Sequence, residues 1–276
     1  MTATADSAQL AEFDRDAAVT PSGEGIYAAD LPQGWHVGGG INGGFQLAVI
    51  ANAIRAELPE HPDPLAISAY YLSPATPGPG AVDVTVKRQG RSASTVAAEL
   101  RQGDDVRLTT LATYGDLGAL PEQPPLLDAE PLRLPPVEDC VSNELAPADF
   151  RKIAPLIERF DMHFHPDQVG FFLGEPTGRG ELSCWFRLKD GREPDPISLL
   201  FAVDAMPPVS GDLGLPGWAP TLELSAYVRR DPAPGWLRLV HRTRHVSGGQ
   251  FEEDCEVWDS ADNLVAQSRQ LARLPR

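Results

Sequence analysis

Ser68-Ala69-Tyr70 returns later in the chain as Ser225-Ala226-Tyr227, and this internal repeat decides the fold that the sequence predicts. Pro77-Gly78 returns as Pro234-Gly235 at the same offset of 157 residues (225 − 68 and 234 − 77). A period of this length is far above the roughly 20–50 residues of solenoid repeats. It predicts two copies of one folding unit in a chain of 276 residues, a length that suits two domains.

The same order of elements surrounds each copy of the repeat. An apolar segment of helical character comes first, at residues 45–58 and again at 197–206. Four segments with the alternation of strands follow each of them, separated by polar or Gly/Pro-rich turns. One buried helix followed by an antiparallel meander predicts a curved sheet wrapped around that helix. The expected strands are at residues 65–72, 81–88, 93–101 and 106–114, and at 221–229, 236–246, 251–258 and 264–271.

A proline-rich stretch between residues 116 and 148 separates the two halves. It shows little periodicity, which is typical of a linker. We therefore expect an N-terminal domain at residues 1–118, a linker at 119–148 and a C-terminal domain at 149–276. The second half is also expected to hold strands near residues 168–172 and 181–188, ahead of its helix.

Charge and cysteine usage limit the partners and the compartment. The formal net charge of −16 disfavours nucleic acid and anionic membrane surfaces, since both are bound through clustered Lys and Arg. No apolar run approaches the ~20 residues that span a bilayer, and the first residues lack the features of a signal peptide. Cys140, Cys184 and Cys255 are widely spaced, as core residues in a reducing compartment are. We expect a cytoplasmic protein.

Of three familiar motifs of cofactor, metal or nucleophile sites, two lack the context that they need and one is absent. Gly38-x-Gly40-x-x-Gly43 matches a dinucleotide-binding pattern, but no core strand leads into it and a meander follows its helix. His163-x-His165 has no third ligand at a metal-binding spacing. No GxSxG sequence is present, which argues against a serine nucleophile of the α/β-hydrolase type. We expect no dinucleotide, no metal and no redox cofactor.

Asp204 is the most suggestive single residue. It stands in the apolar segment Leu199-Leu200-Phe201-Ala202-Val203-Asp204-Ala205-Met206, near the C-terminal end of the expected helix. The helix dipole disfavours a carboxylate there by about 0.3–1 kcal/mol. Burial would raise its pKa and make it a usable general base. The plain alternative is an aspartate at a solvent-facing helix end.

Taken together, these motifs resemble those of the double hot-dog acyl-CoA thioesterases, the acyl-CoA thioesterase II group and its actinobacterial relatives. In the second half, the matching segments are Val203-Asp204-Ala205, Thr221-Leu222-Glu223-Leu224-Ser225 and Leu264-Val265-Ala266-Gln267-Ser268-Arg269-Gln270. In the first half, they are Gly39-Gly40, Ser68-Ala69-Tyr70-Tyr71-Leu72-Ser73-Pro74 and Gly90-Arg91-Ser92. The resemblance implies an α+β double hot-dog fold, with two fused halves that each wrap a curved antiparallel sheet around one central helix.

The resemblance also implies a catalytic apparatus for hydrolysis of an acyl-CoA thioester. Asp204 would take a proton from water, while Thr221 and Gln270 would hold that water by hydrogen bonds. Backbone amides near Gly43 and Gly44 would stabilise the oxyanion. Since the overall charge repels an anionic ligand, a local basic patch is needed, for which Arg88, Arg91, Arg229 and Arg230 are the candidates.

Two other functions remain open at this point. One is a hot-dog protein that binds acyl-CoA, or another acyl ligand, without hydrolysing it, since this needs the pocket but not the base. The other, a hydratase or dehydratase, usually needs a histidine at the helix end, and neither expected helix carries one. The acyl chain length and the formation of a homo-oligomer are also left open.

Overall fold

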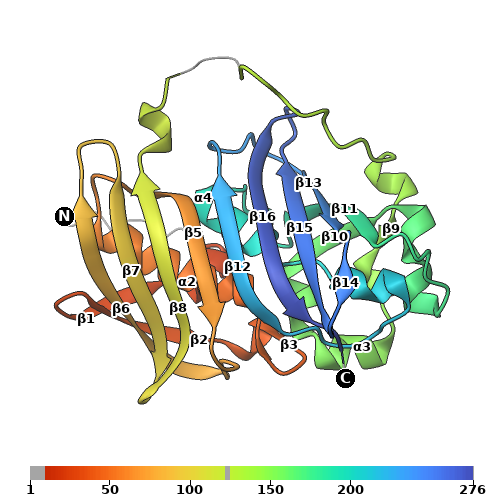
Figure 1. Ribbon diagram of the computed structural model, residues 1–276, viewed down its shortest axis with the longest axis horizontal. Helices are drawn as coiled ribbons and strands as arrows, with labels where there is room; N and C mark the ends of the chain where they lie inside the picture. Colours follow the sequence, from red (N-terminus) through yellow and green to blue (C-terminus); the bar gives the residue numbers. More distant parts are fainter. Residues whose placement is uncertain (1–9, 122–124, 276) are drawn as a thin grey trace, which may run out of the picture.

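A single antiparallel sheet extends across the computed structural model, which describes residues 10–121 and 125–275. Figure 1 shows this sheet in front of two helices, with the strands of the first half on the left and those of the second half on the right. Within the described residues it has 14 strands, of which β14 (Val246–Ser247) pairs only with β15. The others follow the order β1 (Val19–Gly23), β2 (Ile26–Leu31), β6 (Gly78–Gln89), β7 (Ser94–Gln102), β8 (Asp105–Gly115), β5 (Asp63–Tyr71), β12 (Thr221–Val228), β16 (Leu264–Arg273), β15 (Gln250–Trp258), β13 (Leu237–Arg242), β11 (Glu181–Leu188), β10 (Phe160–Phe164) and β9 (Val141–Ser142).

The two halves of the sheet are related through the β5–β12 pair at its centre. Outward from that pair, β8, β7 and β6 follow on one side, and β16, β15 and β13 follow in the same connectivity on the other. Ser68 and Ser225, equivalent in the sequence repeat, lie directly opposite each other, with their Oγ atoms 2.9 Å apart. An approximate two-fold axis therefore passes between these serines. The predicted pair of helix-and-meander units is confirmed.

Four α-helices lie in the described residues: α1 (Glu12–Asp16), α2 (Gly43–Glu57), α3 (Ala148–Ile153) and α4 (Pro196–Ala202). Asn42 caps α2 by accepting a hydrogen bond from the Phe45 amide at 2.9 Å. Asp195 and Ser198 form a capping box at the start of α4, where Pro196 is the first helical residue. No described helix has the length and hydropathy required to cross a membrane.

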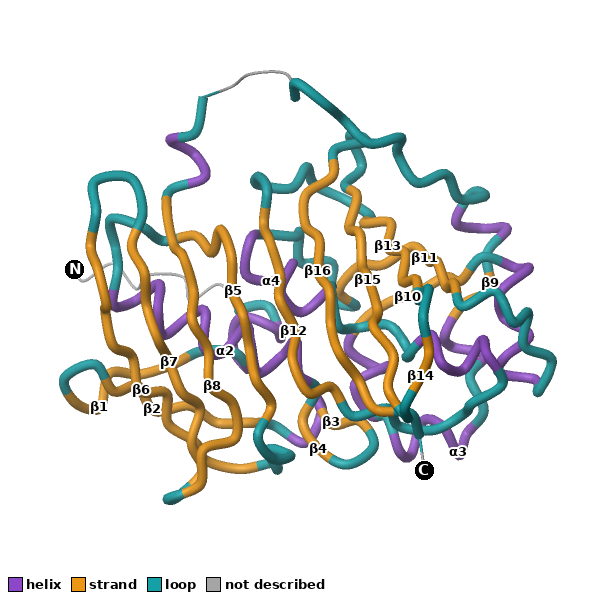
Figure 2. The backbone as a smooth tube through the Cα atoms, in the orientation of Figure 1, coloured by secondary structure: helices purple, strands orange, loops and turns teal. Residues whose placement is uncertain are grey.

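Short helical turns and one small hairpin connect these elements. Figure 2 shows many of these turns gathered beside β9 and α3, at the end of the sheet that belongs to the second half. The turns are η1 (Gln33–Trp35), η2 (Leu117–Ala119), η3 (Val137–Asp139), η4 (Asn143–Leu145), η5 (Pro155–Arg159), η6 (Pro166–Leu173) and η7 (Val209–Leu213), and the hairpin consists of β3 (His36–Val37) and β4 (Gly40–Ile41).

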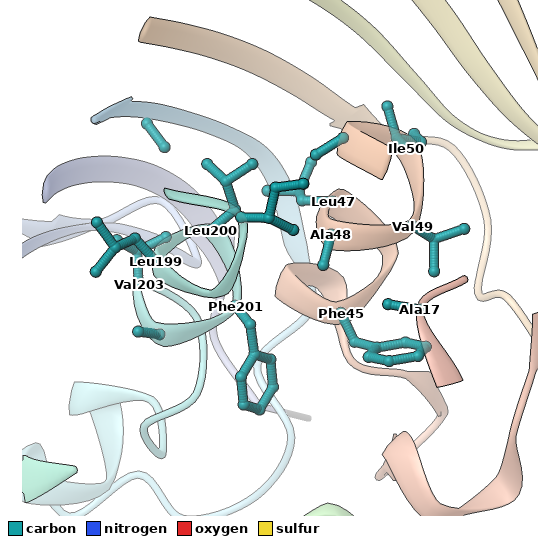
Figure 3. Close-up of a cluster of buried hydrophobic side chains, with 14 of the residues drawn as sticks. Ala17, Phe45, Leu47, Ala48, Val49, Ile50, Leu199, Leu200, Phe201 and Val203 are labelled. Carbon is teal, nitrogen blue, oxygen red and sulfur yellow. The ribbon is translucent and has the colours of Figure 1, made fainter. Parts of the chain in front are cut away.

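The core forms where α2 and α4 pack against each other under the sheet. Gly44 allows the close approach, because a Cβ there would lie 2.8 Å from the carbonyl oxygen of Phe201. Phe45 and Phe201 are fully buried side chains of the cluster drawn in Figure 3, and Trp35 stacks on Phe45 at 4.4 Å between ring centroids. Burial of each such ring stabilises the fold by about 1.5–3 kcal/mol. The two helices therefore act as one core element that carries both halves of the sheet.

Three local features differ from the expectations. Residues 168–172 belong to the helical turn η6 and not to a strand, because Pro166 opens it and the His165 Nδ1 accepts a hydrogen bond from the Asp167 amide. The expected strand at 236–246 ends at Arg242, and β14 forms separately. Helix α4 ends at Ala202, so Asp204 lies in the turn that follows it. The domain boundaries at 118/119 and 148/149 stay a prediction.

Candidate active site

Asp204 lies where the start of α2 meets the end of α4. Its Oδ2 accepts hydrogen bonds from the Gly44 amide at 2.8 Å and from the Asn42 Nδ2 at 3.1 Å. The same Asn42 Nδ2 is also 2.9 Å from the Asp204 carbonyl oxygen. Within residues 10–121 and 125–275, no hydrogen bond to the Oδ1 is found. One carboxylate oxygen is thus held in place while the other remains free to accept a proton.

The environment of Asp204 brings its pKa close to neutrality. Burial is the largest cause and raises the pKa of this carboxyl from 3.8 to about 6. The hydrogen bond from Gly44, the charge of His241 and the bond from Asn42 lower the pKa, while the negative charge of Glu253 raises it, and burial dominates. A carboxylate with this pKa is a stronger base than an ordinary aspartate and is still ionised at pH 7.

Thr221 and Gln270 form a hydrogen-bonded chain that ends on a buried glutamate. The Thr221 hydroxyl donates to the Gln270 Oε1 at 2.6 Å, and the Gln270 Nε2 donates to the Glu253 Oε1. The Glu253 Oε2 accepts from the Val209 amide at 2.6 Å. A bulge between Thr221 and Glu223 interrupts the β12–β16 ladder at this point. The side chains of Thr221 and Gln270 are therefore fixed by the strands that carry them.

His241 lies behind this chain, fully buried on β13. Its Nδ1 is 3.1 Å from the Glu253 Oε1. Burial alone would lower the pKa of His241, but Cys255 and the Glu253 carboxylate raise it well above its usual value. An imidazole and a carboxylate thus lie side by side beneath Gln270.

A cavity of about 740 Å³ joins these groups. Asp204, Thr221 and Gln270, the three predicted catalytic residues, all line it, as do Asn42, Gly43 and Glu253. The rest of the wall is mostly apolar. Large aromatic side chains from the segment that precedes β11, and one from the loop before β12, supply much of it: Phe150, Phe160, Phe164, Phe171, Phe172 and Trp218.

Gly43 and Gly44, the two glycines predicted to stabilise an oxyanion, differ in whether their backbone amides are free to bind a ligand. The Gly44 amide is already bonded to Asp204 at 2.8 Å. Gly43 is the first helical residue, so its amide has no carbonyl partner inside the helix. The wider glycine motif lies in the β3–β4 hairpin and the helix start, and a meander follows it. Of the two, Gly43 can offer its amide to a ligand.

The structure does not bring the four candidate arginines to the cavity. Arg229 and Arg230 follow the C-terminal end of β12, whereas Thr221 begins that strand, and they donate to Gln267 and Asn263. Arg88 lies near the end of β6 and Arg91 in the turn that follows, next to the start of β5 and not to its cavity end. Among the described residues that line the cavity, Arg273 is the basic one. The sequence pattern places these arginines at the ends of strands but does not show which end of the sheet holds the site.

Three site residues were not predicted from the sequence: Asn42, Tyr71 and Glu253. Asn42 carried a usable signal, because an asparagine directly before a glycine pair and an apolar helix is a capping residue. Glu253 stands among acidic neighbours on β15, and only the strand register shows that it faces the core. Tyr71 follows another tyrosine, and the pleat alone places one of them inside and the other outside.

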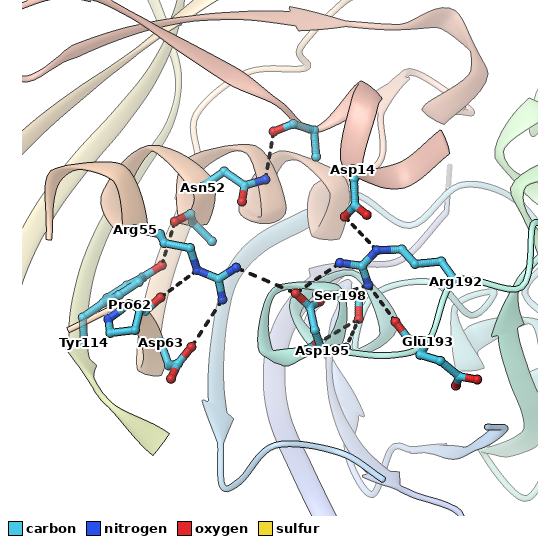
Figure 4. Close-up of polar contacts among 12 residues, drawn as sticks. Asp14, Asn52, Arg55, Pro62, Asp63, Tyr114, Arg192, Glu193, Asp195 and Ser198 are labelled. Carbon is cyan, nitrogen blue, oxygen red and sulfur yellow. Dashed lines mark hydrogen bonds and ion pairs between the residues drawn. The ribbon is translucent and has the colours of Figure 1, made fainter. Parts of the chain in front are cut away.

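The opposite end of the helix pair is closed by ion pairs. Arg55, near the end of α2, lies 3.3 Å from Asp63 and 3.8 Å from Asp195 (Figure 4). Arg192 bridges Asp195 at 3.1 Å and Asp14 at 2.7 Å. These charged side chains are paired with one another, and none of them lines the large cavity.

Comparisons with known proteins agree with this arrangement. Residues 31–115 match the family model of the acyl-CoA thioesterase N-terminal domain, and residues 137–274 match that of the acyl-CoA thioesterase C-terminal domain. A candidate thioesterase II from Thermobifida fusca is 32% identical, with a TM-score of 0.88 and coverage of 97% of this chain and 99% of that one.

Two further relatives extend the comparison. A protein of unknown function with the hot dog fold, from Alicyclobacillus acidocaldarius, is 22% identical and covers 96% of this chain and 98% of its own, with a TM-score of 0.84. An uncharacterised protein of Mycobacterium tuberculosis is 29% identical over 266 residues, which is 91% of each chain. The predicted α+β double hot-dog fold is confirmed.

Proposed function

Because the chain belongs to the acyl-CoA thioesterase family of paired N- and C-terminal domains, we propose that it hydrolyses acyl-CoA thioesters to a free acid and CoA. One observation carries this proposal. A carboxylate with its pKa raised to about 6 opens, together with Thr221 and Gln270, onto an apolar cavity that can hold an acyl chain. An acyl-binding protein without catalysis would need the cavity, but it would gain nothing from a buried carboxylate that is costly to ionise.

In the proposed reaction, Asp204 acts as a general base. Water held between the Asp204 Oδ1 and the Thr221–Gln270 pair attacks the thioester carbonyl carbon, while its proton passes to the carboxylate. The carbon–sulfur bond then breaks as the tetrahedral intermediate collapses. The proton passes from Asp204 to the departing CoA thiolate, so that acid and thiol leave and the base is regenerated. Thioesters are electrophilic enough for direct attack when a base and oxyanion donors are in place.

Asn42 and Glu253 have positioning roles in this scheme. Asn42 donates to both the side chain and the backbone of Asp204, which fixes the rotamer of the base. Glu253 accepts from the Gln270 Nε2, so the Gln270 Oε1 must face Thr221. Thr221 then donates to Gln270, and its hydroxyl lone pairs stay available to a water molecule.

The acyl chain and the CoA part would occupy different surroundings. We place the acyl chain among the aromatic side chains of the cavity, including Phe164 and Phe172, whose ring centroids are 5.5 Å apart. Arg273 is the basic side chain at the cavity and is exposed, so it is suited to a CoA phosphate. The cytoplasm remains the proposed compartment, supported by the three unpaired cysteines Cys140, Cys184 and Cys255.

A thiol-release assay tests the proposal. The protein is incubated with saturated acyl-CoA substrates of increasing chain length, and released CoA is measured with a thiol-reactive dye. We expect turnover that rises with pH through about 6, as Asp204 ionises. Absence of turnover at every chain length, together with saturable acyl-CoA binding, would instead identify a non-catalytic acyl-CoA-binding protein.

A further inference from the structure

The hydroxyl of Tyr71 is a buried polar group with no assigned role. Tyr71 ends β5 and lines the cavity, and within the described residues its hydroxyl has no hydrogen-bond partner. An unsatisfied buried hydroxyl costs about 1–3 kcal/mol. Such a cost at the wall of a cavity points to a partner that arrives with the ligand.

The Tyr71 hydroxyl and the Asp204 carboxylate both lie close to Gly43. A Cβ built on Gly43 would lie 2.8 Å from the Tyr71 hydroxyl oxygen and 2.9 Å from the Asp204 Oδ2. Both groups therefore reach the same side of the first residue of α2, and only a glycine leaves room for them. The Gly43 amide, which has no acceptor inside the helix, belongs to that residue too.

The oxyanion needs donors that the helix start cannot supply alone. The first amides of α2 are nearly all engaged: Gly44 bonds Asp204, Phe45 bonds the Asn42 side chain, and Gln46 bonds the Asn42 carbonyl. Only the Gly43 amide remains. Oxyanion sites are commonly built from two donors, and a side-chain hydroxyl can serve as one of them.

The Tyr71 hydroxyl is also a donor throughout the working range. Burial is the main reason that its pKa lies well above the usual value, and the negative charges of Asp204 and Glu223 raise it further. The phenol thus stays neutral and keeps its proton near pH 7, where Asp204 is ionised. It can therefore donate to an oxyanion without becoming the general acid.

We propose that Tyr71 is a further catalytic residue, whose hydroxyl donates to the thioester carbonyl oxygen and, with the Gly43 amide, stabilises the oxyanion. The inference rests on the proposed thioesterase function. In the ground state the hydroxyl orients the carbonyl, and the bond strengthens as negative charge develops on that oxygen during attack by water.

The test compares Tyr71→Phe with Tyr70→Phe. Tyr70 is the preceding residue of β5, and its side chain is 54% exposed, so it offers a matched removal of a hydroxyl outside the cavity. We expect Tyr71→Phe to lower kcat by about 10²–10³-fold, the effect of removing one oxyanion donor, with KM within about threefold of the parent. Tyr70→Phe should match the parent in both values.

Two further readouts separate this role from a structural one. Affinity for a non-hydrolysable thioether analogue of acyl-CoA should be unchanged in Tyr71→Phe, because the thioether has no carbonyl oxygen to bind. The pH at which kcat is half-maximal should also stay at the parent value, since the donor does not serve Asp204. A parent-like kcat in Tyr71→Phe, or a loss of analogue binding as large as the loss of kcat, would overturn the role of Tyr71 alone. A parent protein without turnover would overturn the thioesterase function and this role together.

Discussion

Helix α4 has seven residues and an aspartate next to each end: Asp195 caps its start, and Asp204 follows its end. At the first end, burial would raise the pKa of Asp195, but the Arg192 guanidinium and the Ser198 hydrogen bonds hold it below its usual range. At the second end, no arginine of the described part of the chain pairs with the carboxylate, and burial raises the pKa of Asp204 to about 6. One aspartate is stabilised as a carboxylate, and the other is kept reactive.

The strands around these two ends differ in the same way. The ladders align the halves residue by residue: Leu224 faces Gln270 in one half, as Ile67 faces Ala112 in the other, and the same bulge follows Thr221 and Pro64. The neighbouring strands extend this alignment. Glu253 faces Gln270 in the second half, and Val96 faces Ala112 at the equivalent place in the first half. In the same way, Cys255 faces His241, and Ala98 faces Val84. Four polar residues of the site therefore have apolar counterparts in the first half. The counterpart of Thr221 is Pro64, that of Gln270 is Ala112, that of Glu253 is Val96 and that of His241 is Val84.

This difference separates what the repeat conserves from what function requires. Strand order, register and bulge are shared by both halves because they build the continuous sheet. Buried polar side chains cost free energy unless they are satisfied, and Gln270, Glu253 and His241 have apolar counterparts in the first half. At the other end, Arg55 and Asp195 fill the corresponding place with ion pairs. We infer that the chain has one hydrolytic site, at the end that carries Asp204.

The largest expected effect comes from exchanging each aspartate for its amide. Asp204→Asn should lower kcat by about 10²–10⁴-fold, the contribution of a general base, because the amide cannot accept the proton of water. The hydrogen bonds from Gly44 and Asn42 can still be accepted by the amide oxygen, so analogue binding should persist. Initial rates of CoA release at saturating substrate provide the measurement.

Asp195→Asn is the matched control for that exchange. It makes the same chemical change at the other end of α4, where asparagine also caps helices well. We expect its kcat to equal that of the parent. Equal losses in the two variants would show that the aspartates act through the stability of the helix and not through chemistry.

At pH 7.5, the two variants should differ from the parent in unfolding free energy with opposite signs. The folded protein binds more protons at Asp204 than the unfolded chain does between about pH 4 and 6, because its folded pKa is about 6 and the unfolded value 3.8. Its contribution to stability therefore falls as pH rises through this window. Asp204→Asn should remove that loss and be more stable than the parent at pH 7.5 by about 1–3 kcal/mol.

For Asp195, the lowered pKa reverses the sign. The ionised side chain stabilises the fold above the unfolded pKa, and this contribution is lost as pH falls through the lower folded value. Asp195→Asn should therefore be less stable than the parent at pH 7.5, and the difference should shrink toward pH 3. Urea unfolding at a series of pH values measures the stability of each variant relative to the parent. A difference of the same sign in both variants at pH 7.5 would contradict the contrast between the two ends.

A smaller effect is expected for the residues that hold the water. Thr221→Val and Gln270→Ala should each lower kcat about tenfold, on the order of 1 kcal/mol. The first removes the hydroxyl that accepts a hydrogen bond from the water, and the second removes the amide oxygen that orients this hydroxyl. Ala112→Gly, at the counterpart of Gln270, should leave kcat unchanged. The same assay decides the point, and a parent-like rate in both site variants would exclude the Thr221–Gln270 pair from positioning the water.

The sequence predicts much of this arrangement because the sheet repeats its own pattern. Ser68 and Ser225 mark the repeat in the sequence and lie opposite each other in the structure. Asp204 was identifiable because a carboxylate at the end of an apolar helix violates local preference. Its partner Asn42 is 162 residues away, a contact that no local pattern encodes. The same limit applies to the four arginines, since the sequence shows the neighbouring strands but not that these strand ends lie away from the cavity.

A titration of binding sites tests the single-site inference most directly. The parent protein is titrated by calorimetry with a non-hydrolysable thioether analogue of the acyl-CoA that it hydrolyses fastest. We expect one analogue bound per chain, because among residues 10–121 and 125–275 the large cavity is lined at the Asp204 end and not by Arg55 or Asp195. Two analogues per chain would show that the end closed by Arg55 and Asp195 also accepts substrate, and the contrast between the two ends would then be wrong.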